Sequence, residues 1–123
     1  MHFQNCKLIR VIDGDTIVAE IDLGFHVTTQ QIFRLKGIDT HELRSNDEYE
    51  KIKAGQEKLF VERLLTTGQN MQIFSEKTEK FGRWLADVYY YNTEFLEYRN
   101  LSDDIKKFMN REELEKENKG LFE

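Results

Sequence analysis

The sequence contains no proline, a single cysteine and no long hydrophobic run. Without proline, no loop has a φ angle fixed by a pyrrolidine ring. The one cysteine, Cys6, excludes an internal disulfide framework and a cysteine-rich zinc site, and we expect it to be a half-buried small hydrophobic residue. No apolar stretch approaches the roughly 18 residues that a membrane-spanning helix needs. Residues 1–7 lack the features of a signal peptide, so a cytoplasmic protein without membrane contact is expected.

Positive charge is also scarce, because 18 basic residues stand against 23 acidic ones and the net charge is −5. This balance argues against a protein that holds nucleic acid by bulk basicity. The excess acid lies in residues 84–123, so a local cationic site elsewhere stays open. Apolar material is sufficient for folding, since Leu, Ile, Val and Phe make up 35 of the 123 residues. With no repeat, low-complexity tract or linker, we expect residues 1–123 to form one domain.

The order of hydrophobic patterns predicts a small barrel with helices. Between residues 7 and 35, β-branched runs flank Asp13-Gly14-Asp15, a strong turn signal, and three meandering strands are expected there. Gly68 and Gly120 are expected to end helices. The other expected strands lie at 71–74 and 84–91, and the expected helices lie at 54–67, 103–109 and 112–118. The predicted fold class is α+β, mainly β: a five-stranded Greek-key, OB-fold-like barrel with about three helices.

Three short segments hold the candidate functional residues: the turn at 13–16, residues 34–42 and residues 80–83. Each alone is typical of ordinary structure, since an Asp-Gly-Asp turn is more often a solvated hairpin than a metal site. Together, two carboxylates from separate loops can ligate Ca²⁺ or Mg²⁺, and two arginines supply fixed forks for phosphoryl oxygens. Phosphodiester hydrolysis requires a cation, a base that activates water, and positive charge beside the phosphate.

In this order and at these separations, the segments resemble the staphylococcal nuclease (thermonuclease) family. The likeness covers roughly residues 7–91, including the intervening order of strands and helix. The matching segments are Val11-Ile12-Asp13-Gly14-Asp15-Thr16, Phe33-Arg34-Leu35 with Ile38-Asp39-Thr40-His41-Glu42, and Lys80-Phe81-Gly82-Arg83-Trp84-Leu85-Ala86.

The resemblance implies a Ca²⁺-dependent nuclease with a metal site and a water-activating base. Asp15, Asp39 and the backbone carbonyl of Thr40 would bind Ca²⁺. Glu42 would activate or orient the attacking water, and Asp13 would support the turn. Hydrolysis of the P–O5′ bond, leaving 3′-phosphate ends, is the implied reaction.

The resemblance also implies how the substrate is held. Arg34 and Arg83 would be catalytic residues that hold the scissile phosphate and stabilise its transition state. Lys80 and Phe81 would bind substrate, and the implied partner is single-stranded or locally melted DNA or RNA. A monomer is expected.

Two departures from the family pattern support an alternative function. His41 stands where the family usually has proline, so the loop loses a φ constraint, and we expect this histidine to be solvent-exposed. The segment between the last two expected helices is short, and no residue matches the family's base-stacking tyrosines. Alternation along a strand leaves at most one face of Tyr89-Tyr90-Tyr91 for stacking on bases. The alternative is a catalytically weak or inactive nuclease-like OB module that binds nucleic acid or a protein partner. A third hypothesis is a shortened domain whose substrate groove is completed by a partner in an assembly.

Overall fold

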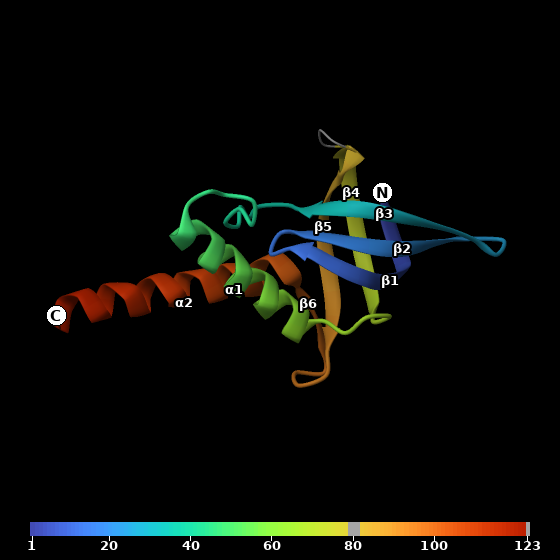
Figure 1. Cartoon of the computed structure of the whole chain (residues 1–123). Helices are drawn as coiled ribbons and strands as arrows, with labels where there is room; N and C mark the ends of the chain where they lie inside the picture. The colour runs from blue at the N-terminus through green and yellow to red at the C-terminus, as the bar shows by residue number, and fades with distance from the viewer. Residues whose placement is uncertain (79–81, 123) are drawn as a thin grey trace.

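The strands form one mostly antiparallel sheet that closes into a barrel (Figure 1). The computed structural model describes residues 1–78 and 82–122, without the side chains of 77–78 and 115–122. Within these residues the elements are β1 (His2–Asp13), β2 (Thr16–Gly24), β3 (Val27–Leu35), α1 (Glu48–Leu64), β4 (Asn70–Thr78), β5 (Trp84–Asn92), β6 (Glu97–Asn100) and α2 (Leu101–Phe122). The sheet order is β3-β2-β1-β4-β5-β6, and β3 also pairs with β5. The predicted mainly β, OB-fold-like barrel is therefore confirmed, with β6 added at one edge.

The barrel closes at a short parallel seam between β3 and β5, whereas the other strand pairs are antiparallel. The seam pairs Phe33 with Trp84, Arg34 with Leu85, and Leu35 with Ala86. Arg83 directly precedes β5, so the seam places it next to the strand that carries Arg34, the other arginine singled out in the sequence.

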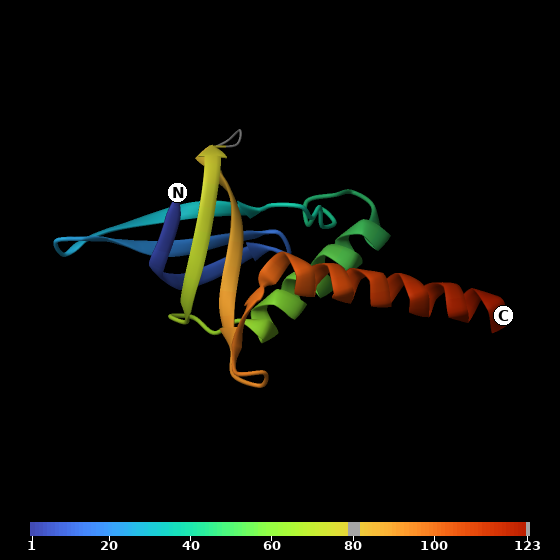
Figure 2. The ribbon, with the colours of Figure 1, turned by 180° about the vertical axis from the view of Figure 1, so that it is seen from behind.

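The core fills the barrel, and two helices cover one end of it. Alternate strand residues such as Leu8, Ile17 and Phe33 are buried, and Val61 of α1 and Ile105 of α2 join them. Cys6 is fully buried in the same cluster, and burial raises the pKa of its thiol to about 11 despite a backbone hydrogen bond from Ile73. The β2–β3 hairpin projects from the end opposite the helices (Figures 1 and 2).

The number and bounds of the helices correct the sequence-based prediction. α1 begins at Glu48 rather than near residue 54, because the Asp47 side chain caps it by accepting hydrogen bonds from the backbone N–H groups of Tyr49 and Glu50. The predicted break between residues 109 and 112 is absent, and α2 continues past Gly120. Asn110 disfavours a helix interior by less than about 1 kcal/mol, which is too little to interrupt a segment without proline. Neither helix described is long and apolar enough to cross a membrane.

Candidate functional site

Arg34 is the centre of the candidate site, at the end of β3 where the barrel closes. Its Nη1 donates hydrogen bonds to the carbonyl oxygens of Leu35 and Ile38 at 2.8 and 2.7 Å. Its Nη2 lies 3.4 Å from Asp15 Oδ2 and 3.2 Å from Asp39 Oδ1. Two carboxylates from separate loops therefore meet at one nitrogen of a guanidinium that the backbone holds in place.

Asp15 forms the buried side of this cluster, with 8% of its surface exposed. Its Oδ1 accepts a hydrogen bond from Thr16 Oγ1 at 2.9 Å, and its Oδ2 accepts one from the Thr40 backbone N–H at 3.2 Å. Asp39 forms the open side, since 91% of its side chain is exposed. The site therefore has a fixed interior wall and an outer carboxylate that solvent or a ligand can reach.

The sequence-predicted metal ligands thus lie together. The backbone of Thr40 is tied to Asp15, and Asp39 precedes it directly. The donor set fits a hard cation, because Ca²⁺ takes carboxylate and carbonyl oxygens and completes its six to eight ligands with water. Among the residues that the structure describes, no group of three or more His, Cys, Asp or Glu side chains could hold a metal ion. A cation here would depend on the Thr40 carbonyl and water as well as on the two carboxylates.

Acidic and basic side chains both act on the carboxyl group of Asp13, which lies in the same turn as Asp15. Burial raises the pKa of the Asp13 carboxyl, and the negative charge of Asp15 raises it further. The positive charges of Lys58, Arg44 and Arg83 act in the opposite direction and reduce the increase. Arg83 is therefore near enough to this turn to affect it, in agreement with its place beside the seam.

Two of the predicted substrate-binding residues cannot be placed. Lys80 and Phe81 lie outside the described residues.

Glu42 stands apart from the cluster. Its side chain is exposed, and its backbone N–H donates a hydrogen bond to Glu50 Oε1 in α1 at 3.1 Å. Within residues 1–78 and 82–122, no hydrogen bond or ion pair joins the Glu42 carboxylate to Asp15, Asp39 or Arg34. A role in activating water would therefore act through the attacking water itself, without a direct bond between the Glu42 carboxylate and the cluster.

Glu57 is the residue at this site that sequence reasoning missed. Its carboxylate is 3% exposed and accepts a hydrogen bond from the His41 backbone N–H at 2.8 Å. The His41 ring is bonded as well, with Nδ1 at 2.9 Å from Glu57 Oε2. The expectation of a solvent-exposed His41 is wrong: the ring is partly buried against α1, and this contact constrains the loop that proline would otherwise constrain.

The same glutamate contacts the turn between β1 and β2. A Cβ atom added to Gly14 would lie 3.0 Å from Glu57 Cβ and 3.0 Å from Thr40 Cγ2, so a larger residue would fit only if these side chains shifted slightly. The position of Glu57 in the sequence could have indicated its role, because its spacing places it on the buried face of α1 with Ala54 and Val61. An acidic side chain at an apolar position of a helix is one to examine for a buried partner.

Glu57→Ala is expected to lower the free energy of unfolding by about 1–3 kcal/mol, because it leaves the His41 backbone N–H buried without its acceptor. Glu57→Gln keeps an acceptor oxygen and should cost less. Urea denaturation measures both, and Glu62→Ala, on the exposed face of α1, is the matched control. Equal stability of Glu57→Ala and Glu62→Ala would contradict the assignment.

Comparison with known proteins finds no protein-family model and no curated protein that matches this chain. The resemblance to the staphylococcal nuclease family therefore stays a prediction from the three segments of sequence, and the function is argued below from the residues.

Proposed function

We propose that the chain is a Ca²⁺-dependent nuclease that hydrolyses phosphodiester bonds of single-stranded or locally melted DNA or RNA. The observation that supports this most directly is the placement of Arg34 Nη2 between Asp15 and Asp39. Carboxylates that suit a hard cation and a fixed arginine fork that suits phosphate then lie together, at the C-terminal end of β3. A purely structural ion pair would not need a second carboxylate that is 91% exposed.

Each charged residue has a role in this proposal. Ca²⁺, when bound, supplies positive charge beside the phosphoryl oxygens and helps to place the attacking water. Arg34 and Arg83 stabilise the negative charge that develops on the phosphate oxygens in the transition state. Glu42 accepts the proton of the attacking water as the new P–O bond forms and the P–O5′ bond breaks. The resemblance described above suggests 3′-phosphate products.

A second candidate, a module that binds nucleic acid and cleaves it slowly or not at all, is favoured by the position of Glu42. Its carboxylate does not contact the cluster among the described residues, and its N–H is tied to Glu50. A misplacement of about 1 Å can cost on the order of 10²-fold in rate. The two functions differ in one observable, metal-dependent cleavage.

The test is cleavage of single-stranded DNA and RNA in Ca²⁺, Mg²⁺ or EDTA. We expect wild type to cleave with Ca²⁺ and not with EDTA, and Glu42→Gln to lower kcat by about 10²–10⁴ because a general base is lost. Ca²⁺ affinity, measured by calorimetry, should stay within a few-fold, because Glu42 is not a proposed ligand. Glu62→Gln removes an equal charge from the exposed face of α1 and should cleave like wild type. Tight binding of nucleic acid without cleavage in any metal would select the binding module.

A further inference from the structure

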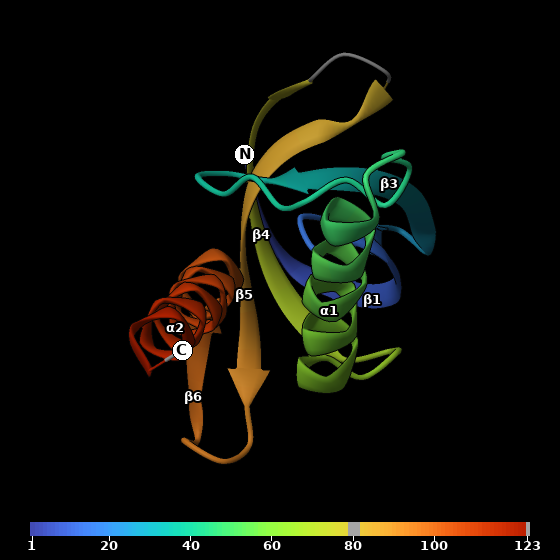
Figure 3. The ribbon, with the colours of Figure 1, turned by 60° about the vertical axis from the view of Figure 1, so that its left-hand side comes forward.

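A groove lies at the end of α1 opposite the candidate site. Loop 39–47 leads into the first turn of α1 (Figure 3). The groove begins beside the last turn of α1, at Arg63 and Leu64. One cavity of about 640 Å³ lies between the end of α1, the start of β4 and the β5–β6 hairpin. A second cavity of about 340 Å³ lies between α1, α2 and the same hairpin. The two cavities are neighbours, because they share the lining residues Leu64, Tyr90, Asn92 and Glu94, and we refer to them together as the groove.

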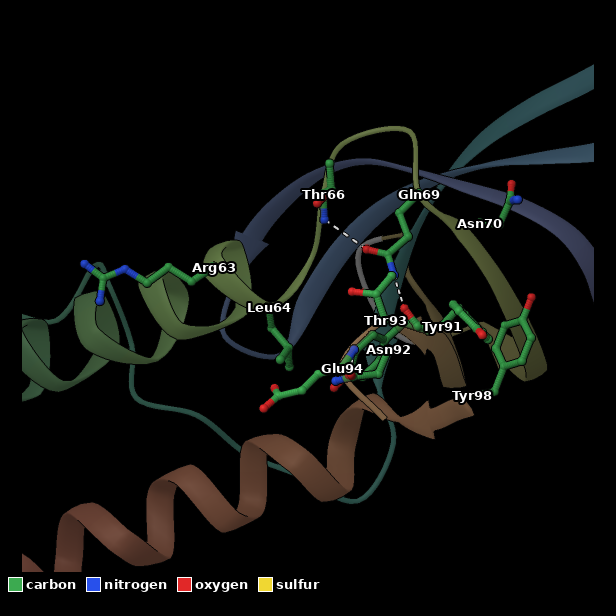
Figure 4. Close-up of a pocket in the computed structure, with 11 residues that line it drawn as sticks. Arg63, Leu64, Thr66, Gln69, Asn70, Tyr91, Asn92, Thr93, Glu94 and Tyr98 are labelled. Atoms are coloured by element: carbon green, nitrogen blue, oxygen red, sulfur yellow. Dashed lines mark hydrogen bonds between the residues drawn. The ribbon is translucent and has the colours of Figure 1, made fainter. Parts of the chain in front are cut away.

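The hairpin side of the groove presents aromatic rings to solvent. Tyr91 and Tyr98 pack edge to face, with ring centroids 5.4 Å apart, and they are 38% and 45% exposed (Figure 4). Phe95 is 58% exposed, and Arg99 lies over its ring at 4.8 Å from the centroid. Exposed rings of this kind are platforms on which bases stack without sequence preference.

Hydrogen bonds hold the loops around the groove in place. Gln69 Oε1 accepts from the Thr66 backbone N–H at 3.0 Å, and its Nε2 donates to the Tyr91 carbonyl at 2.7 Å (Figure 4). Asn92 Oδ1 accepts from the backbone N–H groups of Glu94 and Phe95 at 2.9 and 3.0 Å. The walls are therefore formed before a ligand arrives, which lowers the ordering cost of binding.

The charge of the groove is opposite to that of the whole protein. Lys107 and Arg111 are one helical turn apart on α2 and line it together. The full set of charged lining residues is Arg63, Arg99, Lys107 and Arg111 against Glu94 and Asp104. Since Arg99 is paired with Asp104, three cations remain opposite one carboxylate, in a chain of net charge −5. A polyanion is the ligand that this distribution favours.

We propose that this groove binds single-stranded nucleic acid, with bases on Tyr91, Tyr98 and Phe95 and phosphates beside Lys107 and Arg111. An acidic peptide would satisfy the cations, but planar bases also use the exposed ring faces. The inference goes beyond the proposed function, because binding here needs neither Ca²⁺ nor cleavage. It would give a substrate strand a second anchor at the far end of α1.

The test measures fluorescence anisotropy of a labelled oligothymidylate of about 16 nucleotides in EDTA, where the candidate metal site is inactive. Lys107→Glu is expected to weaken binding at least about fivefold and to reduce the slope of log affinity against log salt by about one. Lys106→Glu is the matched control: it makes the same charge change one residue away, on the side of α2 that faces Gly37. It should bind within about twofold of wild type, because bulk charge alone has changed.

A second pair of variants tests the rings. Tyr98→Ser should weaken binding at least about fivefold with little change in the salt slope, because stacking rather than charge is lost. Phe25→Ser, at the 99% exposed tip of the β2–β3 hairpin, is its control. Circular dichroism melts should show that all four variants fold.

The outcomes separate this inference from the proposed nuclease. Equal binding by Lys107→Glu and Lys106→Glu, no binding of the oligonucleotide by wild type, or binding of polyglutamate in its place would overturn the groove assignment. Loss of binding in the groove variants of a protein that never cleaves would support the groove and reject the nuclease. Asp15→Asn should abolish cleavage and leave binding in EDTA unchanged; a parallel loss of this binding would argue against two separate sites.

Discussion

Arg34→Ala is expected to reduce Ca²⁺-dependent cleavage by about 10²–10³ while Ca²⁺ affinity stays the same or rises. The rate should fall because a fixed donor to the developing phosphate charge is lost. The affinity should not fall, because Arg34 Nη2 now neutralises both Asp15 and Asp39, and its removal leaves two carboxylates that a cation can satisfy. The opposite direction of the two effects is the signature of a phosphate-binding arginine beside a metal site.

Cleavage kinetics and calorimetry measure these two quantities, and two further variants make the result specific. Arg34→Lys keeps the charge but cannot bond two carbonyls and two carboxylates at once, so it should also lose most of the activity. Arg10→Ala, which removes an exposed arginine from β1, should have little effect. Cleavage within tenfold of wild type in Arg34→Ala, or a parallel loss of Ca²⁺ affinity, would place the chemistry elsewhere.

Asp104→Ala is expected to lower the free energy of unfolding by about 2–3 kcal/mol, because the buried Tyr90 hydroxyl then loses its charged acceptor. Asp104 joins α2 to the barrel: Tyr90 of β5 donates to Oδ2, and Arg99 of β6 bonds both oxygens. Urea denaturation measures the loss. Asp103→Ala, an exposed neighbour in the same helix turn, is the control, and equal stability of the two variants would contradict this role.

The same network predicts a pH dependence. Burial alone would raise the pKa of the Asp104 carboxyl, but hydrogen bonds from Arg99 and Tyr90 outweigh it, and the pKa lies below its ordinary value. The stabilisation is therefore present above the ordinary value near 3.8 and is lost as the pH falls through the lower, folded-state value. Burial and the bond to Asp104 raise the pKa of Tyr90 to about 12, so that its contribution is lost as the pH rises from about 10 to about 12. Asp104→Asn should flatten the acid limb of stability against pH, and Tyr90→Phe the alkaline limb.

Much of the barrel could be predicted because its signals are local. Asp13-Gly14-Asp15 between β-branched runs marks the β1–β2 hairpin, and alternation marks β5. β6 was missed because its four residues, Glu97–Asn100, are mostly polar and become a strand by pairing with the end of β5. The sequence predicts a boundary at Asn110 that α2 does not have, because helix propensity alone is a weak signal.

Site residues that belong to short sequence motifs could be predicted. Contacts that arise only from the packing of distant segments could not. The structure brings together Asp15, Arg34 and Asp39, whose roles remain predictions. The bond between His41 and Glu57 could not be read from either residue, because their 16-residue separation becomes a contact only when α1 lies across the end of the barrel. The groove between α1 and α2 could not be predicted for the same reason. The sequence of either helix alone does not show which of its faces lies toward the other helix.

The parallel seam has a consequence for the order of events during folding. β1, β2 and β3 can pair as local hairpins, but the three residue pairs of the seam join segments far apart in the chain. Contacts of long sequence separation must overcome the greatest loop-closure entropy, and they tend to form slowly. The seam places β5, which directly follows Arg83, beside the strand that carries Arg34, so a chain still being synthesised would lack the proposed phosphate clamp until β5 has left the ribosome. Under the proposed function, cleavage activity would then arise only after most of the barrel has been made.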